Sequence, residues 1–226
     1  MKWFGAFVIR LPLRNLEKMP ILDHHSSQNK ILMKPICKMF AVAIVALILP
    51  LLVSAQTWMR DQVHSTAMYT IRHAVTPMIG IFRSFEVKMD FDPNAPLHAT
   101  VNATIQVNSV LMGSAGLGEH LHGEDFFDAV TFPQWTFAST KIIQQKGGKT
   151  HNQFVDQGKL TAQGVTKDVE IPFEFLGTRE CQRGSKAGFT AEFTINRLEY
   201  GIGEERNGGI GNDLKIKVML DMNSKM

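Results

Sequence analysis

The amino-acid sequence predicts an all-β protein, an extended antiparallel β-barrel of about eight strands with one or two short helices. From residue 56 onward, segments that alternate apolar and polar residues follow one another at hairpin spacing. This alternation gives each strand one apolar and one polar face, as in an antiparallel sheet with one wet side. No second set of amphipathic helices is evident to cover the apolar faces, so we expect the sheet to close on itself.

Turn residues divide this part of the chain into its elements. Pro77 interrupts the segment 74–79, which we expect to form a turn or a short helix. Gly113 and Gly123 bound one or two expected helical turns within 114–123. The expected strands are 56–61, 66–73, 81–92, 97–108, 131–145, 150–161, 165–176, one within 187–203 and one around 214–220.

The first 55 residues are expected to be a leader and not part of the barrel. They carry seven of the 24 Lys/Arg and only two of the 21 Asp/Glu, and an uncharged apolar run over Met39–Val53 precedes Ser54 and Ala55. A basic segment, an apolar segment and small residues at its end are typical of a secretory signal peptide. We expect this signal peptide over 33–55 with cleavage after Ala55, and an over-extended start or disordered arm over 1–32. An uncleaved anchor is the alternative, although a span needs about 20 apolar residues.

The remainder, 56–226, is expected to be a single domain of nearly neutral charge. The basic excess of the whole chain, a formal net charge of +3, belongs to the leader. A nearly neutral domain gives no electrostatic support for nucleic-acid binding.

The strand within 187–203 ends in a cation on its apolar side. Phenylalanines alternate there with polar residues, and Arg197 has the parity of the phenylalanines. Its guanidinium is therefore expected either to face the polar end of a bound molecule or to pair with a carboxylate such as Asp61 or Asp125.

Aromatic side chains are concentrated on the predicted inner parity, where they either fill a core or surround a cavity. The small residues Ala67, Ala103 and Ala191 share that parity. Interleaved small and large side chains leave room for a ligand or fit the taper of a filled barrel, and both readings stay open at this point.

Short motifs in a specific order along 56–222 resemble those of the YceI-like family. The chain departs from the family pattern at His122, where Arg or Lys is common. The matching motifs are Asp61-x-x-His64-Ser65, Tyr69-x-Ile71-x-His73, Gly80-x-Phe82, Phe91-Asp92-Pro93, Asp125-Phe126-Phe127-Asp128, Phe132-Pro133, Phe137-x-Ser139-Thr140, Gly158-x-Leu160-Thr161, Gly164-Val165-Thr166, Gly188-Phe189, Thr194-Ile195-Asn196-Arg197 and Tyr200-Gly201.

The resemblance implies a secreted or periplasmic bacterial protein with a lipocalin-like barrel that binds a long apolar molecule, such as a polyisoprenoid or a fatty-acid derivative. It implies no catalysis, cofactor, metal or nucleic-acid partner. Transient contact with a membrane surface is compatible with this role, and a monomer and a homodimer both stay open. Around the head group we expect His73, His122 and Arg197. Along the apolar tail we expect Tyr69, Ile71, Phe85, Val87, Phe126, Trp135, Phe137, Phe173, Phe189 and Phe193.

Two other functions compete with that of a carrier. His64, His73, His120 and His122 could serve a metal- or histidine-assisted hydrolase, although their spacing matches no diagnostic metal motif. The barrel could also be filled by its own side chains and belong to an envelope or stress protein that has no ligand.

Overall fold

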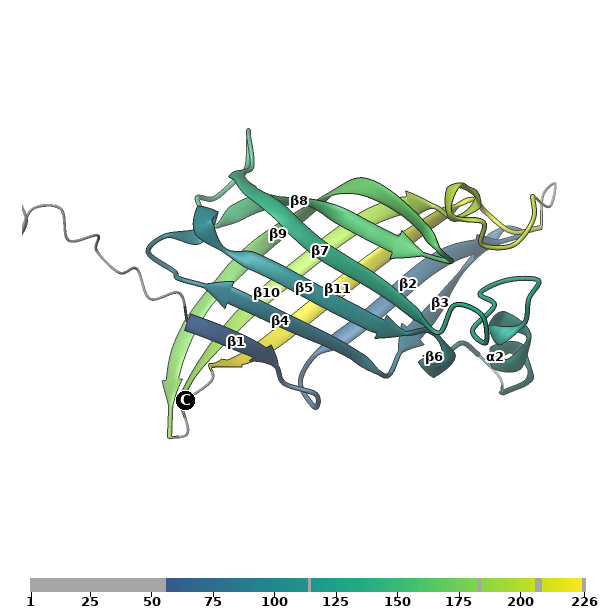
Figure 1. The fold of residues 1–226 in the computed structure, drawn as a ribbon, viewed down its shortest axis with the longest axis horizontal. Helices are drawn as coiled ribbons and strands as arrows, with labels where there is room; N and C mark the ends of the chain where they lie inside the picture. Colours follow the sequence, from purple (N-terminus) through teal and green to yellow (C-terminus); the bar gives the residue numbers. More distant parts are fainter. Residues whose placement is uncertain (1–55, 114, 183, 206–208, 225–226) are drawn as a thin grey trace, which may run out of the picture. The chain divides into compact units, whose positions relative to one another are not determined.

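The computed structural model describes residues 56–113, 115–182, 184–205 and 209–224 (Figure 1). The predicted signal peptide over 33–55, its cleavage after Ala55 and the arm over 1–32 lie outside the described residues. Among the residues that are described, no helix combines the length and the apolar character needed to cross a membrane.

Eight antiparallel strands close into a barrel, which confirms the predicted fold class (Figure 1). They pair in the order β1-β4-β5-β7-β8-β9-β10-β11, and β1 also pairs with β11, so the ring is closed. Apolar side chains of alternating residues face inward and polar ones face solvent. These strands are β1 (Gln56–Arg60), β4 (Phe85–Phe91), β5 (Thr100–Gln106), β7 (Gln134–Gln144), β8 (Gln153–Ala162), β9 (Val165–Cys181), β10 (Gly184–Asn196) and β11 (Asp213–Ser224).

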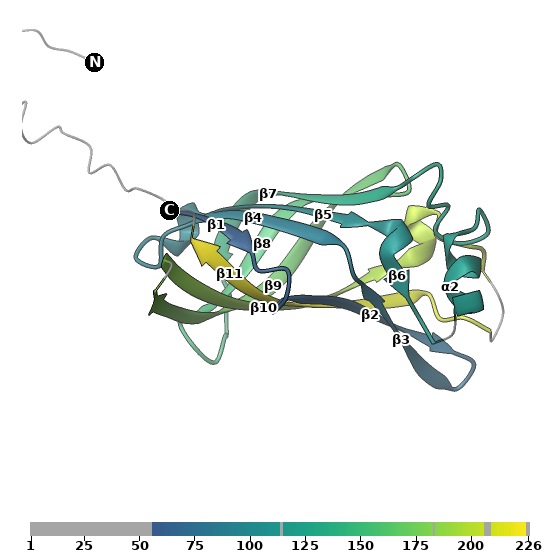
Figure 2. The same cartoon turned by 90° about the horizontal axis from the view of Figure 1, so that it is seen from below.

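Further elements extend the sheet beyond this ring. β11 pairs with β2 through residues 215–219 and with β1 through residues 222–224, so β1 and β2 lie end to end along it. β3 pairs with β2, and β6 pairs with β3, near the end of the barrel that carries helix α2 (Figures 1 and 2). The additional elements are β2 (Thr66–His73), β3 (Thr76–Phe82), β6 (Val110–Leu111), α2 (Ala115–His122) and the 3-10 turns η1 (Pro96–His98), η2 (Val107–Ser109) and η3 (Arg197–Tyr200).

The segment around Pro77 is a strand, so the predicted turn or short helix over 74–79 is wrong. Pro77 lies near the beginning of β3, opposite Arg72 of β2. The other edge of β3 pairs further along, where Ile81 and Phe82 meet β6. One side of β3 is therefore an edge at Pro77, and an edge strand tolerates a residue without an N–H group.

The barrel wall lacks strand pairing along one stretch between β9 and β10. β10 pairs with β9 only through residues 173–181, and the first part of β9 pairs with β8 alone. Residues 165–172 of β9 and 192–196 of β10 therefore form no ladder with each other, and we call this stretch the seam. An ion pair of 2.8 Å between Lys167 Nζ and Glu199 Oε2 joins β9 to η3 next to it.

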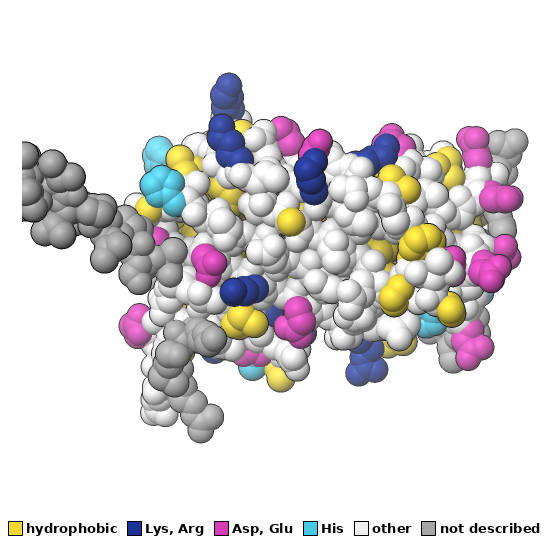
Figure 3. Space-filling view, viewed as in Figure 1, with side chains coloured by type: hydrophobic (Ala, Val, Ile, Leu, Met, Phe, Trp, Pro, Cys, Tyr) yellow, Lys and Arg dark blue, Asp and Glu magenta, His cyan; other side chains and the backbone are white. Residues whose placement is uncertain are grey.

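Charges of both signs are scattered over the outer face shown in Figure 3, and acidic side chains gather at the end that carries α2. Glu119, Glu124 and Glu204 are exposed in the segments at this end. Because the signs are mixed, this face has no extended positive field of the kind that attracts nucleic acids.

Candidate ligand-binding site

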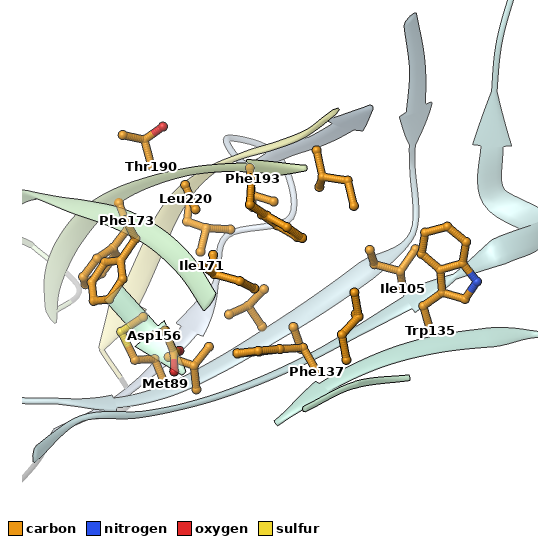
Figure 4. A pocket seen from close by; sticks show the side chains of 18 of the residues that line it. Met89, Ile105, Trp135, Phe137, Asp156, Ile171, Phe173, Thr190, Phe193 and Leu220 are labelled. Atoms are coloured by element: carbon orange, nitrogen blue, oxygen red, sulfur yellow. The ribbon is translucent and has the colours of Figure 1, made fainter. Parts of the chain in front are cut away.

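An apolar cavity of about 120 Å³ lies inside the barrel (Figure 4). Strands β4, β5, β7, β8, β9, β10 and β11 all contribute side chains to its lining. Val101, Ala103 and Phe193 line it and are only partly buried, although they are on the inner face of the wall. The inner side chains of these strands therefore do not pack completely against one another.

Two aromatic clusters lie at the ends of this cavity. The cluster near α2 has ring centroids 5.4–6.4 Å apart and consists of Tyr69, Phe82, Phe127 and Trp135. The other has ring centroids 4.9–5.3 Å apart and consists of Phe91, Phe175 and Phe189. Trp135 and Phe189 both line the cavity. Phe173, which contacts Phe189, lies at the opposite end from Trp135 in Figure 4. The cavity is thus bounded by aromatic rings along the barrel.

The predicted tail-binding residues divide into two groups. Those that line the cavity are Val87, Trp135, Phe137, Phe173, Phe189 and Phe193. Those that are buried in the packed core without lining it are Tyr69, Ile71, Phe85 and Phe126. The strand residues of both groups share the inner face, so their difference lies in their position along the barrel axis, which sequence alternation does not report. Phe126 lies in the connection between α2 and β7.

Arg197 stabilises the loop that follows β10. Its side chain is 1% exposed. Its Nε donates a hydrogen bond to Gly211 O at 2.9 Å, and its Nη1 donates to Ile202 O at 2.7 Å. Its Nη2 donates to Glu204 O at 2.8 Å and to Asn212 Oδ1 at 3.3 Å. These acceptors belong to the connection between η3 and β11, which the guanidinium therefore holds in place.

This arrangement corrects the predicted role of Arg197. The guanidinium does not line the cavity, and its hydrogen bonds already serve the loop. The structure therefore assigns it a structural role in place of the predicted contact with a head group. The acceptors of these hydrogen bonds are backbone carbonyl oxygens and the amide oxygen of Asn212, in place of the expected carboxylate of Asp61 or Asp125.

The two histidines predicted around the head group lie apart from the cavity. His73 is exposed at the end of β2, where it bridges to Ile210. His122 is half-buried at the end of α2, and its Nε2 has no hydrogen-bond partner among the described residues. Neither side chain lines the cavity, so the predicted head-group set does not assemble around it.

Asp156 is a lining residue that the sequence patterns did not single out. It is 3% exposed and lies on β8, between Ile142 of β7 and Ile171 of β9. Ser139 Oγ donates a hydrogen bond to Asp156 Oδ1 at 2.6 Å. Burial raises the pKa of the Asp156 carboxyl to about 6, and the hydrogen bond from Ser139 opposes this increase.

Two buried hydrogen-bond donors near α2 lack partners among the described residues. They are Tyr69 Oη and Trp135 Nε1. In Figure 4 the indole nitrogen of Trp135 is turned away from the other labelled side chains. Burial raises the pKa of the Tyr69 hydroxyl, so that group stays protonated. The end of the interior near α2 thus contains hydrogen-bond donors, whereas Asp156 provides a hydrogen-bond acceptor.

A separate polar cluster joins β10 and β11 to the turn after β1. Lys186 Nζ donates to Asp61 Oδ2 at 2.9 Å and to Asp221 Oδ1 at 3.0 Å, and His64 Nδ1 lies 3.1 Å from Asp61 Oδ1. The hydrogen bond from Lys186 holds the pKa of Asp61 well below its usual value. Among the described residues, Asp61, His64 and Asp221 are the grouped metal-ligand candidates. An ammonium already bridges these two carboxylates, and the other histidines of the hydrolase hypothesis do not join them.

Comparison with known proteins places this barrel in a family. A model described as the YceI-like domain matches residues 58–222. A UPF0312 protein of Shewanella sp. (strain W3-18-1) is 32% identical over 162 residues, which cover 70% of this chain and 83% of the relative. Protein YceI of Salmonella newport (strain SL254) is 33% identical over 141 residues, which cover 62% of this chain and 71% of the relative.

Solved structures share the fold. BcnA of Burkholderia cenocepacia has a TM-score of 0.63 and 27% identity, covering 72% of this chain and 98% of its own. A polyisoprenoid-binding domain from Saccharophagus degradans has a TM-score of 0.55 and 10% identity, covering 75% of this chain and 99% of its own. Because the family model spans the barrel from β1 to β11, the chain belongs to the YceI-like family.

Proposed function

We propose that the protein is a periplasmic carrier that holds the apolar tail of a long-chain lipid, such as a polyisoprenoid or a fatty-acid derivative, inside its barrel without changing it chemically. The apolar cavity between the two aromatic clusters is the observation that supports this most directly. Membership of the YceI-like family is consistent with a binding role. The resemblance of the barrel to a domain described as polyisoprenoid-binding concerns the fold.

The apolar lining would bind a lipid tail through the hydrophobic effect. A methylene group that leaves water for such an environment gains about 0.8 kcal/mol, so two added methylenes should tighten binding by roughly tenfold. Inner residues Val101 and Ile105 are four positions apart on β5, which corresponds to about 13 Å of wall at about 3.3 Å per residue. Chain length should therefore matter until the tail reaches the aromatic rings at either end.

The cavity requires the wall to adjust when a long tail binds. Its volume of about 120 Å³ is smaller than the roughly 300–1,000 Å³ typical of ligand sites. The seam is where the wall has no ladder hydrogen bonds to break, and Ile171 and Phe193 line the cavity beside it. We therefore place ligand access and the required side-chain movement at the seam.

Two measurements test this function. Organic extraction of protein purified natively from the periplasm, followed by mass spectrometry, should recover a long-chain lipid at near-stoichiometric amount. Calorimetric titration with saturated alcohols of increasing length should show affinity that rises with each added methylene and then levels off. A barrel that is repeatedly empty after gentle purification, together with no binding across the series, would contradict the carrier.

A matched pair of substitutions locates the binding. Ala191 lines the cavity from β10, whereas Ala138 of β7 is exposed on the outer face. Ala191→Leu should fill part of the cavity and lower the affinity for the longer alcohols by about tenfold or more, because the added side chain occupies the space of at least two methylenes. Ala138→Leu adds the same atoms outside and should leave the affinity unchanged.

The small volume also favours a second function, that of a barrel filled by its own side chains. In that case the protein would act in the envelope through its surface, and the alcohol series would not bind. Ala191→Leu would then change stability alone, with no effect on any ligand. The extraction and the titration separate the two functions directly.

A further inference from the structure

An ionisable group stands in a lining that is otherwise made of apolar side chains and two threonines. Asp156 lines the cavity, is 3% exposed and accepts a hydrogen bond at Oδ1 from Ser139. Its Oδ2 has no hydrogen-bond partner among the described residues. Figure 4 shows Asp156 together with the apolar side chains that line the cavity.

Among the described residues, no basic side chain lines the cavity around Asp156. β7 and β9 flank β8 and present Ile142 and Ile171 beside it. Among the described lining residues, Asp156 is the only titratable one. The charged side chains nearest in the flanking strands, Lys141 and Glu170, are exposed on the outer face. A buried carboxyl without a full set of partners is unfavourable in its ionised form, whereas an aliphatic side chain at this position would avoid that cost.

We propose that Asp156, oriented by Ser139, forms a polar subsite that binds the hydrogen-bond-donating end of an amphipathic ligand, an alcohol or amine on a long apolar chain, and discriminates against the matching carboxylate. This inference rests on the proposed carrier function and adds the head-group chemistry to it. In this subsite Oδ2, which accepts no hydrogen bond from a described residue, would accept the ligand's O–H or N–H. Ser139 holds the other oxygen, so the carboxyl has a fixed orientation.

The same geometry explains the discrimination. A carboxylate placed against Asp156 would bring two like charges together in an apolar environment, where the repulsion is larger than in water. A cationic amine would form a charge-assisted hydrogen bond, and an alcohol a weaker one. The raised pKa of Asp156 means that its charge, and therefore its attraction for an amine, changes around pH 6.

The test compares three ligands of equal chain length: tetradecylamine, tetradecanol and tetradecanoate, titrated calorimetrically into the wild-type protein below their critical micelle concentrations. Near pH 8 the amine should bind at least about tenfold more tightly than the carboxylate, since a hydrogen bond to a charged group in a protein is worth that factor or more. The amine is charged throughout the range from about pH 8 to about pH 5, because a primary alkylamine has a pKa of about 10, so its affinity should fall as Asp156 is protonated over that range.

Two variants separate the subsite from a general surface effect. Asp156→Asn should bring the amine and the carboxylate to within about threefold of each other and remove the pH dependence of amine binding, because the amide carries no charge. Asp168→Asn makes the same chemical change at an exposed carboxyl on β9 and should behave as the wild type.

The outcomes distinguish this inference from the function on which it rests. If none of the three ligands binds, the carrier function fails and the subsite fails with it. If all three bind equally, the carrier function stands and the subsite is refuted. Tighter binding of the carboxylate also refutes it and would place the head group at the donors of Tyr69 and Trp135 instead. The wild-type pH dependence provides a test that does not depend on the folding of any variant.

Discussion

Replacement of Asp156 by asparagine should make the protein more stable at neutral pH. Asparagine has the same shape and can still accept the hydrogen bond of Ser139, but it cannot ionise. An aspartate whose pKa rises from 3.8 to about 6 on folding lowers the free energy of unfolding by about 3 kcal/mol once it is ionised in both states. Because the Asp156 side chain is only 3% exposed, screening by solvent reduces this destabilisation only slightly.

The sign of this effect defines a pH window. Below about pH 4 the carboxyl is protonated in both the folded and the unfolded protein, and it imposes no ionisation cost. As the pH rises from about 4 to about 6, the unfolded chain releases its proton first, so wild-type stability falls. The stability advantage of Asp156→Asn over the wild type should therefore grow across this window to at most about 3 kcal/mol and stay constant above it.

Urea unfolding at a series of pH values measures this difference. The buried Trp58 and Trp135 provide the fluorescence signal, and equal slopes of free energy against urea would show that the variant unfolds in the same way. Asp168→Asn is the matched control, because the carboxyl of Asp168 is exposed and pairs with Lys159 on the surface. Parallel pH profiles for the wild type and Asp156→Asn would refute the reasoning, since they would mean that this carboxyl titrates alike in the folded and unfolded states.

The same unfolding assay tests three further substitutions. Arg197→Lys should lower the free energy of unfolding by about 2–4 kcal/mol, because an ammonium cannot reach all four acceptors of the guanidinium. An unchanged value would show that the connection between η3 and β11 is stable without the hydrogen bonds of the guanidinium. Gly158→Ala should cost about 1–3 kcal/mol, since its Cβ would lie 2.5 Å from Ala138 O and from the Phe137 ring; no loss would mean that the β7 backbone yields easily. Lys186→Met should destabilise the protein above about pH 4, because the variant lacks the hydrogen bond that lowers the pKa of Asp61. The loss should become smaller as the pH falls and Asp61 is protonated, since a neutral carboxyl no longer attracts Lys186 in the wild type. A loss that stays constant with pH would contradict this.

Strand positions could be predicted because the two sides of a barrel wall face different environments. Residues of β2, Thr66–His73, match the predicted strand at both ends. Prediction failed where backbone geometry and not polarity decides the outcome. Pro77 was taken as a break although it lies in β3, and the predicted strand over 81–92 is divided because the chain turns at Arg83 and Ser84 between β3 and β4.

The role of Arg197 could not be predicted from its parity. The alternation predicts it on the inner side of the strand, but β10 ends at Asn196, and Arg197 begins η3, from which the chain returns toward β11. The carbonyl oxygens that surround its guanidinium come from this returning segment. Contacts of that kind depend on how a loop folds back in three dimensions, which a pattern of alternating polarity does not encode.

Asp156 did leave a signal in the sequence. It shares its parity with Phe154 and Leu160, which are buried on the inner face of β8. A carboxylate in such an apolar row is rarer and more informative than another aromatic side chain, because burial of an unpaired charge is costly. The candidate head-group residues were chosen instead from cations and histidines at strand ends, which the structure places outside the cavity.

The buried carboxyl also couples ligand binding to stability. Above about pH 6 the ligand-free protein bears the cost of an ionised Asp156, and a donor carried by the ligand would offset part of it. Below about pH 4 there is no such cost to offset. The stabilisation produced by a saturating long-chain amine should therefore increase with pH across this window, whereas the contribution of the apolar tail should not change. Stabilisation that is large but independent of pH would mean that the tail alone binds, with the polar end directed away from Asp156.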